Sequence, residues 1–480
     1  MKKKNSFWGN VGLLLLGSVF AQVITAGALV VLTRVYSPDD FGVLGNYVAT
    51  IMIVGSLSML RYDLAIPLPK SDQEGAKILV LSLGILMGIT LITALVCWGF
   101  GEQFKVLFHL DNLGDTVWIV PLGVVGVGSS FAMAAWLARR GHFQHTSLGV
   151  GLQGITQAGS QIGMSFGPLG ALGLVLGNLA GQVLAGIYYF RTIWQLDRSG
   201  FQGIQFHHLR EVAAKYWRFP AISFWSGCAM ILNQYLPILL MSGLFGKAYA
   251  GLYLIGQRVL HLPVGLISRA VGSVFLPEYS RKHGTEESDK MAGELFQRLL
   301  LQGFPVLLLI GFTAPVTIPL VFGTEWTKAG WMTAWLTPWL GMAFVYAPIS
   351  TIPLVHGKQG REMAAQLMLL LTRVLPFLIL GNTWSADQVF CTFVISTTVS
   401  AVLYMFWIAR LTGQTMFSIC RSIGHALFRS SILLILPFAL TYFIHSNWLT
   451  FASVALVAVI WLIYIFKLNH RKPSETTVIV

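Results

Sequence analysis

The feature that most constrains this chain is the recurrence of apolar stretches of about 20 residues, the length that crosses a lipid bilayer as an α-helix. Fourteen such stretches follow one another, separated by short polar segments: residues 7–32, 41–60, 78–100, 117–138, 148–166, 169–190, 219–244, 248–271, 295–321, 330–355, 363–380, 389–409, 431–444 and 449–466. Only 11% of the residues are charged, against about 25% in soluble proteins. The sequence therefore predicts an all-α, polytopic membrane protein.

Basic residues are distributed unevenly among the segments between these stretches. An even number of spans places both termini on one side, and Lys2, Lys3 and Lys4 assign that side to the cytoplasm. With this assignment, 26 Lys and Arg lie in inward-facing segments and four lie outward: Arg34, Lys105, Lys247 and Lys328. The skew predicts a multi-pass membrane protein with both termini cytoplasmic. Because the charges are spread along the chain, a nucleic-acid partner is not expected.

Three segments have the pattern of a helix start. Ser37-Pro38-Asp39-Asp40 precedes the second span and combines a capping serine, a proline at the first helical position and acidic residues in the first turn. Ser71–Glu74 and Ser385–Gln388 have capping-box spacing before the third and twelfth spans. We expect each serine to cap its helix.

Two segments of the chain form a weak internal repeat, 209 residues apart. Tyr36–Val43 lies between spans one and two, Phe245–Leu252 lies between spans seven and eight, and each contains an aromatic residue followed by glycine. Arg140-Gly141 and Gln359-Gly360 occupy corresponding loops after spans four and ten. Transporters often consist of such repeats. We therefore expect an N-terminal lobe of six helices (1–200), a cytoplasmic amphipathic linker (201–218), a C-terminal lobe of six helices (219–410), and helices 13 and 14 with a cytoplasmic tail (411–480).

The linker contains Phe206, Leu209, Ala213 and Trp217 at helical spacing, with charged residues on the other faces. This pattern predicts a short helix lying on the cytoplasmic surface of the membrane.

Specific stretches of this chain resemble a known family. The first set comprises Thr33–Gly42, Leu60–Ile66 and Pro69-Lys70. The second set comprises Gly251–Tyr253, Gln257–Leu260, Leu262-Pro263, Ser273–Phe275 and Pro277-Glu278. Together with the span count and the repeat, they resemble the polysaccharide transporter family of the multidrug/oligosaccharidyl-lipid/polysaccharide exporter superfamily, which includes O-antigen and capsule-unit flippases. The resemblance covers about residues 7–410.

The resemblance implies a function and partners. It implies a flippase of the bacterial inner membrane that moves undecaprenyl-pyrophosphate-linked oligosaccharide from the cytoplasmic to the outer leaflet by alternating access. The implied partners are membrane lipids, a polysaccharide polymerase and chain-length machinery. It implies no cofactor.

Charged groups inside spans are costly and are therefore candidates for function. Arg258 and Arg373 lie near the middle of spans eight and eleven, whereas Arg34 and Arg61 lie at the ends of spans one and two. All Asp and Glu fall in loops or at span ends, so a passage lined by these arginines would be net positive and would suit a diphosphate. Alternatively, Arg258 caps backbone carbonyls or pairs with Asp63, and Arg373 reaches the membrane edge.

The remaining candidates are polar or charged residues, and each allows two interpretations. His261 lies one turn from Arg258 and either shares its face or packs between helices. Gln153, Gln157 and Gln161 form a polar stripe on span five, which either hydrogen-bonds a neighbouring helix or contacts sugar hydroxyls. Arg61 and Asp63 are expected to form an ion pair that fixes the end of span two, with a gating role as the alternative.

Other functions stay open. A multidrug exporter should show a buried carboxylate, whereas a lipid II-type peptidoglycan precursor flippase would share the fold and the cavity charge. A membrane polymerase or glycosyltransferase would need a sizeable catalytic loop, and the outward loops are short. The sequence contains no GxxxxGK[ST] or HExxH motif, so we expect neither an enzyme nor a metal site. The energy source is left open.

Overall fold

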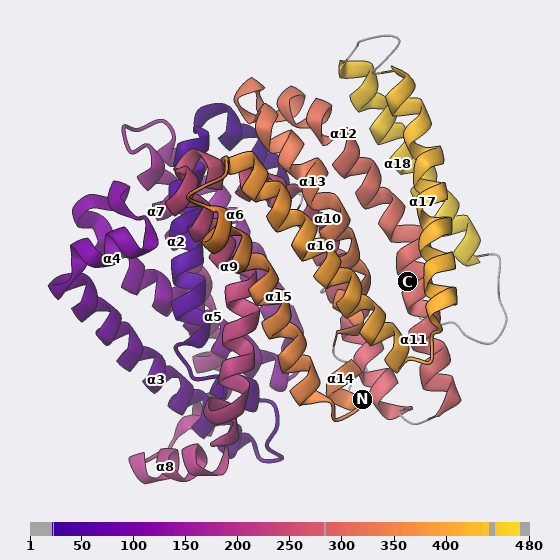
Figure 1. Ribbon diagram of the computed structural model, residues 1–480. Helices are drawn as coiled ribbons and strands as arrows, with labels where there is room; N and C mark the ends of the chain where they lie inside the picture. Colours follow the sequence, from indigo (N-terminus) through magenta and orange to yellow (C-terminus); the bar gives the residue numbers. More distant parts are fainter. Residues whose placement is uncertain (1–21, 23, 283–284, 351, 441–446, 471–480) are drawn as a thin grey trace. The chain divides into compact units, whose positions relative to one another are not determined.

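The computed structural model describes residues 22, 24–282, 285–350, 352–440 and 447–470 (Figure 1). The described residues form helices joined by turns, with no strand among them. The chain divides into two compact units, Met1–Gly251 and Leu252–Val480, here called unit 1 and unit 2. The lysine cluster at the N-terminus and most of the predicted first span lie outside the described residues.

Nine helical segments of the described chain are long and apolar enough to cross a membrane. The helices α6, α10 and α13 have comparable lengths, and two shorter apolar helices, Ile24–Val35 and Asn447–Trp461, complete the series. These helices overlap the fourteen predicted stretches, the first of them only at its end, in the described residues 24–32. The predicted all-α, polytopic fold is therefore confirmed.

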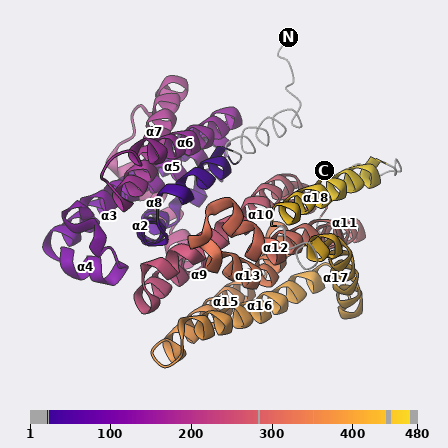
Figure 2. The ribbon, with the colours of Figure 1, turned by 90° about the horizontal axis from the view of Figure 1, so that it is seen from above.

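Unit 1 contains the first group of helices. In chain order they are α2 (Pro38–Leu57), η1 (Tyr62–Ala65), α3 (Asp72–Gly99), α4 (Gly101–Phe108), η2 (Asp111–Trp118), α5 (Ile119–Arg139), α6 (Phe143–Met164), α7 (Ala171–Asp197), η3 (Arg198–Phe201), α8 (Phe206–Lys215), η4 (Phe219–Ser223) and α9 (Phe224–Phe245). The long helix α10 (Lys247–Arg281) begins in this unit. Helices α6 and α7 run side by side in both views (Figures 1 and 2).

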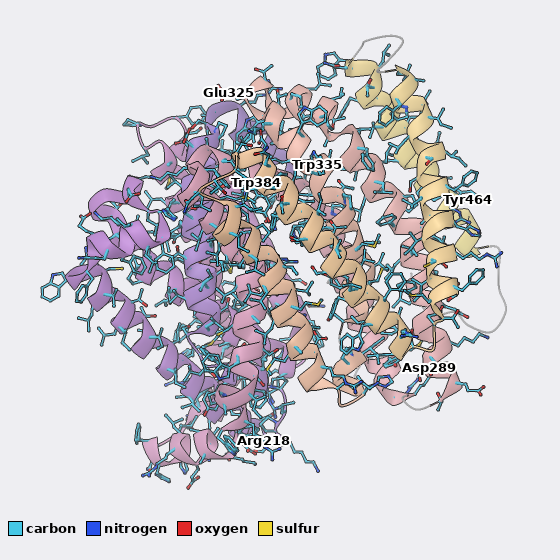
Figure 3. All side chains as sticks on the ribbon, in the orientation of Figure 1. Arg218, Asp289, Glu325, Trp335, Trp384 and Tyr464 are labelled. Carbon is cyan, nitrogen blue, oxygen red and sulfur yellow. The ribbon has the colours of Figure 1, made fainter. Side chains whose placement is uncertain are left out.

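Unit 2 begins within α10 and contains the remaining helices. They are α11 (Glu286–Arg298), η5 (Leu299–Gly303), α12 (Phe304–Phe322), η6 (Thr324–Trp326), α13 (Thr327–Tyr346), η7 (Ala347–Ile349), α14 (Ile352–Val355), α15 (Gln359–Leu380), α16 (Ala386–Leu411), α17 (Met416–Ala439) and α18 (Asn447–His470). Glu325 and Trp384 lie at one end of the unit and Asp289 at the other (Figure 3), as expected for connections that alternate between two sides of a membrane.

Two of the three predicted helix caps form. Ser37 accepts a hydrogen bond from the backbone N–H of Asp40 (3.2 Å), whose carboxylate accepts one from the Ser37 N–H (3.0 Å). Ser385 and Gln388 make the same reciprocal pair. Ser71 is the N-cap residue of α3, so the helix begins where the sequence predicts, but the expected side-chain cap does not form. The Ser71 side chain makes no capping hydrogen bond, and Glu74 instead binds Lys215 and the Tyr216 hydroxyl.

The predicted linker helix forms as α8, but its buried side differs from the predicted apolar face. Val212 is the buried residue, whereas Phe206 and Trp217 are exposed. The inner side of α8 packs on α3. Phe206 is the first residue of α8, and Trp217 follows the helix, which ends at Lys215. Arg218 follows α8 at the end of unit 1 that carries this helix (Figure 3).

Candidate functional site

The turn that follows α2 holds backbone conformations that side-chain-bearing residues rarely adopt. Leu60 and Arg61 both have positive φ, 48° and 64°. Neither is glycine, so each position costs on the order of 1 kcal/mol or more. We call residues 60–63 the Arg61 turn. Because such strain persists only where neighbouring contacts hold it, the turn is a candidate for function.

Two opposite charges lie within this turn without pairing. The Nε of Arg61 and the Oδ1 of Asp63 are both buried, and within the described chain neither atom has a hydrogen-bond partner. Asp63 receives backbone hydrogen bonds from its own N–H and that of Leu64, and it feels the charge of Arg61. The predicted direct ion pair is therefore wrong. The two side chains interact electrostatically, without direct contact.

Burial sets the acidity of Asp63. Loss of hydration raises the pKa of its carboxyl above the ordinary value, and the Arg61 charge offsets part of that rise.

The Arg61 guanidinium lies against Gly227 of α9, where a Cβ would stand 2.8 Å from the Arg61 Nε. Glycine at position 227 therefore makes room for this side chain.

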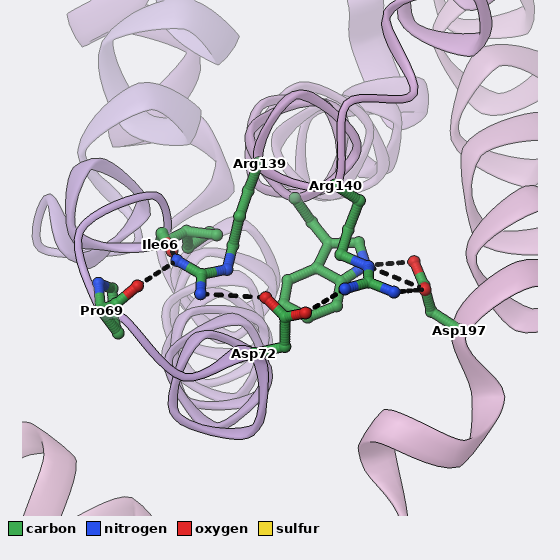
Figure 4. Close-up of polar contacts among 7 residues, drawn as sticks. Ile66, Pro69, Asp72, Arg139, Arg140 and Asp197 are labelled. Carbon is green, nitrogen blue, oxygen red and sulfur yellow. Dashed lines mark hydrogen bonds and ion pairs between the residues drawn. The ribbon is translucent and has the colours of Figure 1, made fainter. Parts of the chain in front are cut away.

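Arg139, at the end of α5, forms hydrogen bonds with the segment that follows the turn. Its Nη1 donates hydrogen bonds to the carbonyl oxygens of Ile66 (3.2 Å) and Pro69 (2.8 Å), and its Nη2 binds Asp72 (3.1 Å) (Figure 4). A Cβ at position 75 would stand 2.7 Å from the Arg139 Nε. Gly75 thus allows the guanidinium to lie flat on the first turn of α3.

The neighbouring Arg140 extends this contact to α7. It binds Asp72 on one side and Asp197 on the other, with its Nε 2.9 Å from the Asp197 Oδ1 (Figure 4). Asp197 is buried and also accepts a hydrogen bond from the indole Nε1 of Trp136 (3.1 Å). We call Asp72, Arg139, Arg140 and Asp197 the ion frame. It joins the ends of α3, α5 and α7 at the level of the Arg61 turn.

A third set of contacts ties the turn to α8. The Tyr62 hydroxyl donates to the carbonyl oxygen of Ala213 (3.1 Å). Lys215 and Tyr216 both bind the carboxylate of Glu74. The interaction with Glu74 raises the pKa of Lys215, which keeps the ammonium charged. The strained turn is thus held from three directions.

Unit 2 contains a second buried cation, Arg373. Its side chain is only 7% exposed, and its Cζ lies 4.5 Å from the ring centroid of Trp339. Its charge also acts on Tyr253, His261 and Tyr346. Arg373 therefore sits inside the helix bundle of α10, α13 and α15, so the alternative that it reaches the membrane edge is wrong.

The other predicted site residues lie on different elements. Arg258 and His261 are half-buried on α10 in unit 2, and Arg34 is exposed near the end of the first described helix. Gln161 is buried and donates to the carbonyl oxygen of Leu174 on α7 (2.8 Å). On the same stripe, Gln153 and Gln157 are half-buried against α7 at Gly181.

Sequence reasoning missed the ion frame. Its members lie next to predicted span ends on one side of the membrane, and that common position was an available signal. Their pairing, however, depends on how three helices pack. Among the residues that the structure describes, no three His, Cys, Asp or Glu side chains lie close enough to hold a metal ion.

Known proteins similar to this chain give its family and fold. Residues 31–330 match the model of the family described as polysaccharide biosynthesis protein. No curated protein sequence matches the chain. The inward closed structure of the lipid II flippase MurJ is 16% identical, with a TM-score of 0.76 over 96% of this chain and 100% of that one.

Two further solved structures belong to transporters of the MOP superfamily. An outward-facing multidrug resistance transporter of the MATE family is 13% identical, with a TM-score of 0.57 over 85% of this chain and 97% of that one. A transporter from Pyrococcus furiosus, described as having a binding pocket of reverse polarity, is 13% identical, with a TM-score of 0.53 and the same coverage. At these identities the likeness concerns the fold alone. The fold is that of multi-pass membrane transporters and flippases.

Proposed function

Because the chain belongs to the polysaccharide biosynthesis protein family, we propose that it is a flippase for undecaprenyl-pyrophosphate-linked oligosaccharide repeat units. It moves them across the bacterial inner membrane during synthesis of a surface polysaccharide such as O-antigen, capsule or exopolysaccharide. Membrane lipids surround it, both termini are cytoplasmic, and a polysaccharide polymerase and chain-length machinery act on the product. No catalytic step is assigned to the chain itself.

The observation that carries this proposal is the missing hydrogen bond at the Nε of Arg61. Its buried Nε has no hydrogen-bond partner in the described chain, and no carboxylate neutralises it by direct contact. A diphosphate would supply charge-assisted hydrogen bonds to such a guanidinium, which are roughly twice as strong as bonds between neutral groups. The strained turn keeps Arg61 in place before the lipid arrives, so little ordering is needed on binding.

The other predicted site residues stay candidates for substrate contact, each within its own unit. In unit 1, Arg34 would contribute positive charge, and Gln153 and Gln157 would offer polar groups to the sugars. In unit 2, Arg258 and Arg373 would contribute positive charge, and His261 would offer a polar group. Alternating access requires two groups of helices that move as bodies. We keep the division into residues 1–200, 201–218, 219–410 and 411–480 as part of the proposal.

The test is transport by the purified full-length protein in proteoliposomes. The substrate is a fluorescent undecaprenyl-diphospho-oligosaccharide, and transport is read from quenching by a membrane-impermeant reagent. Arg61→Gln should reduce the rate at least tenfold, whereas Arg210→Gln, on the exposed side of α8, should keep it. Failure of the wild-type protein to move the lipid, or wild-type rates for Arg61→Gln, would contradict the proposal.

A lipid II-type flippase is a second candidate, favoured by the match to MurJ over almost the whole chain. Both cargoes carry the same diphosphate and differ in the groups attached to it. The same vesicles should therefore be offered lipid II in place of the oligosaccharide lipid. Faster movement of lipid II would assign the protein to the second candidate.

A further inference from the structure

Asp63 has the properties of a proton-binding group. Most of its carboxyl is withdrawn from water, and its Oδ1 has no hydrogen-bond partner in the described chain. A buried oxygen in that state destabilises the folded protein, because it has lost its hydrogen bonds to water and gained none. Protonation removes the charge that burial penalises.

Among the charged groups near Asp63, Arg61 is the one whose charge acts on the Asp63 carboxyl. The η1 segment packs on α3, α5 and η4. Asp72 at the start of α3 and Arg139 of α5 are bound to each other, and η4 contains no titratable side chain. The charge of Arg61 also reaches Cys228 on α9. Tyr62 is engaged with α8.

We propose that Asp63 is a proton-binding site, and that proton binding there is linked to binding of a phosphate-bearing anion at Arg61. While Asp63 is ionised, its carboxylate offsets the positive potential at Arg61 and repels an incoming anion. Once protonated, it leaves the guanidinium to the anion alone. The identity of the anion as the diphosphate of the carrier lipid rests on the proposed function.

The linkage works in both directions. If protonation strengthens anion binding by some factor, the bound anion strengthens proton binding by the same factor. The protein must therefore take up protons at Asp63 when the anion binds, up to one proton per anion. The carboxylate and a proton from the solvent form a carboxylic acid, and the reverse occurs on release. The turn is fixed by the ion frame and by α8, so the two groups stay within electrostatic reach throughout.

The test is titration calorimetry on the purified full-length protein. The probe is farnesyl-diphospho-N-acetylglucosamine, whose diphosphodiester does not titrate near neutral pH. Heats measured in two buffers of different ionisation enthalpy give the number of protons taken up per probe bound. The wild-type protein should take up protons, and its affinity should fall as the pH rises. In Asp63→Asn the uptake and the pH dependence should both disappear.

Two controls isolate Asp63. Glu102→Gln removes an exposed carboxylate on α4 and should leave the wild-type proton uptake intact. If Asp63→Asn does not fold, infrared difference spectra of the wild-type protein serve instead, and binding of the probe should produce the carbonyl band of a protonated carboxyl.

The outcomes are distinct. Probe binding with no proton uptake, or with uptake that survives in Asp63→Asn, overturns this inference and leaves the proposed function standing. In the infrared experiment, the absence of a new carbonyl band does the same. A wild-type protein that binds no probe at any pH overturns both.

Discussion

Gly42 of α2 packs so closely on Lys247 of α10 that a methyl group at position 42 would overlap the Lys247 carbonyl oxygen. The relationship is reciprocal, because a methyl group on Gly251 would overlap the Pro38 carbonyl oxygen and stand 2.8 Å from the Gly42 nitrogen. These glycines belong to the two segments that the sequence predicts as a repeat. The repeated segments therefore meet at their glycines, backbone against backbone.

We expect Gly42→Ala and Gly251→Ala to destabilise the protein by about 1–3 kcal/mol each, the usual cost of forcing extra atoms into a packed contact. The obstacle is backbone in both cases, so no side chain can swing aside. Thermal unfolding in detergent measures the effect. Gly84→Ala is the control, because a Cβ there meets nothing within 4 Å. Equal melting temperatures for Gly42→Ala and Gly84→Ala would contradict the expectation.

Local features of the fold could be predicted from the sequence, and long-range ones could not. The caps at Ser37 and Ser385 depend on residues three positions apart, and both form. Ser71 has the same spacing, but Lys215, 141 residues after Glu74, takes the carboxylate. Tertiary contacts override a local pattern in this way.

In the candidate site, too, residue identities could be predicted from the sequence, whereas backbone conformation and long-range contacts could not. The sequence singles out Arg61 as a cation at a span end, but nothing in Leu60-Arg61 predicts two consecutive positive φ values. Arg140 and Asp197 lie 57 residues apart, and their pairing is set by how α5 and α7 pack. Arg373 could be predicted as an intramembrane cation, whereas its position over Trp339 depends on how α13 and α15 both pack against α16.

The ion frame should contribute substantially to the stability of unit 1. Asp197→Ala leaves Arg140 without its buried partner and Trp136 without an acceptor, so we expect a loss of about 3–5 kcal/mol. Asp387→Ala breaks the exposed pair with Lys328 and should cost about 0–1 kcal/mol. Thermal unfolding of both variants gives the comparison. Similar losses would show that the frame contributes no more than a surface ion pair.

Arg258→Ala and Arg373→Ala should abolish surface polysaccharide in a host that depends on this protein, because each removes a cation proposed to bind the diphosphate. Protein abundance in the membrane should stay at the wild-type level and is measured in parallel. Arg373→Lys keeps the charge but loses the planar stacking on Trp339, so it should retain part of the activity. Wild-type polymer levels in both alanine variants would remove these residues from the site.

The stability of the protein should depend on pH through Asp63. Burial raises the pKa of this carboxyl in the folded protein above its ordinary value of 3.8, so the folded state holds the proton more tightly than the unfolded state. Its contribution to stability is then fully present below pH 3.8 and is lost as the pH rises through the folded pKa. Asp63→Asn removes the charge that burial penalises. The variant should therefore melt a few degrees above the wild type at neutral pH, with a difference that shrinks as the pH falls.

Melting curves recorded from neutral to acidic pH measure this difference, with Glu102→Gln as the matched control. A constant difference between Asp63→Asn and wild type at every pH would mean that the carboxyl of Asp63 does not change its proton affinity on folding.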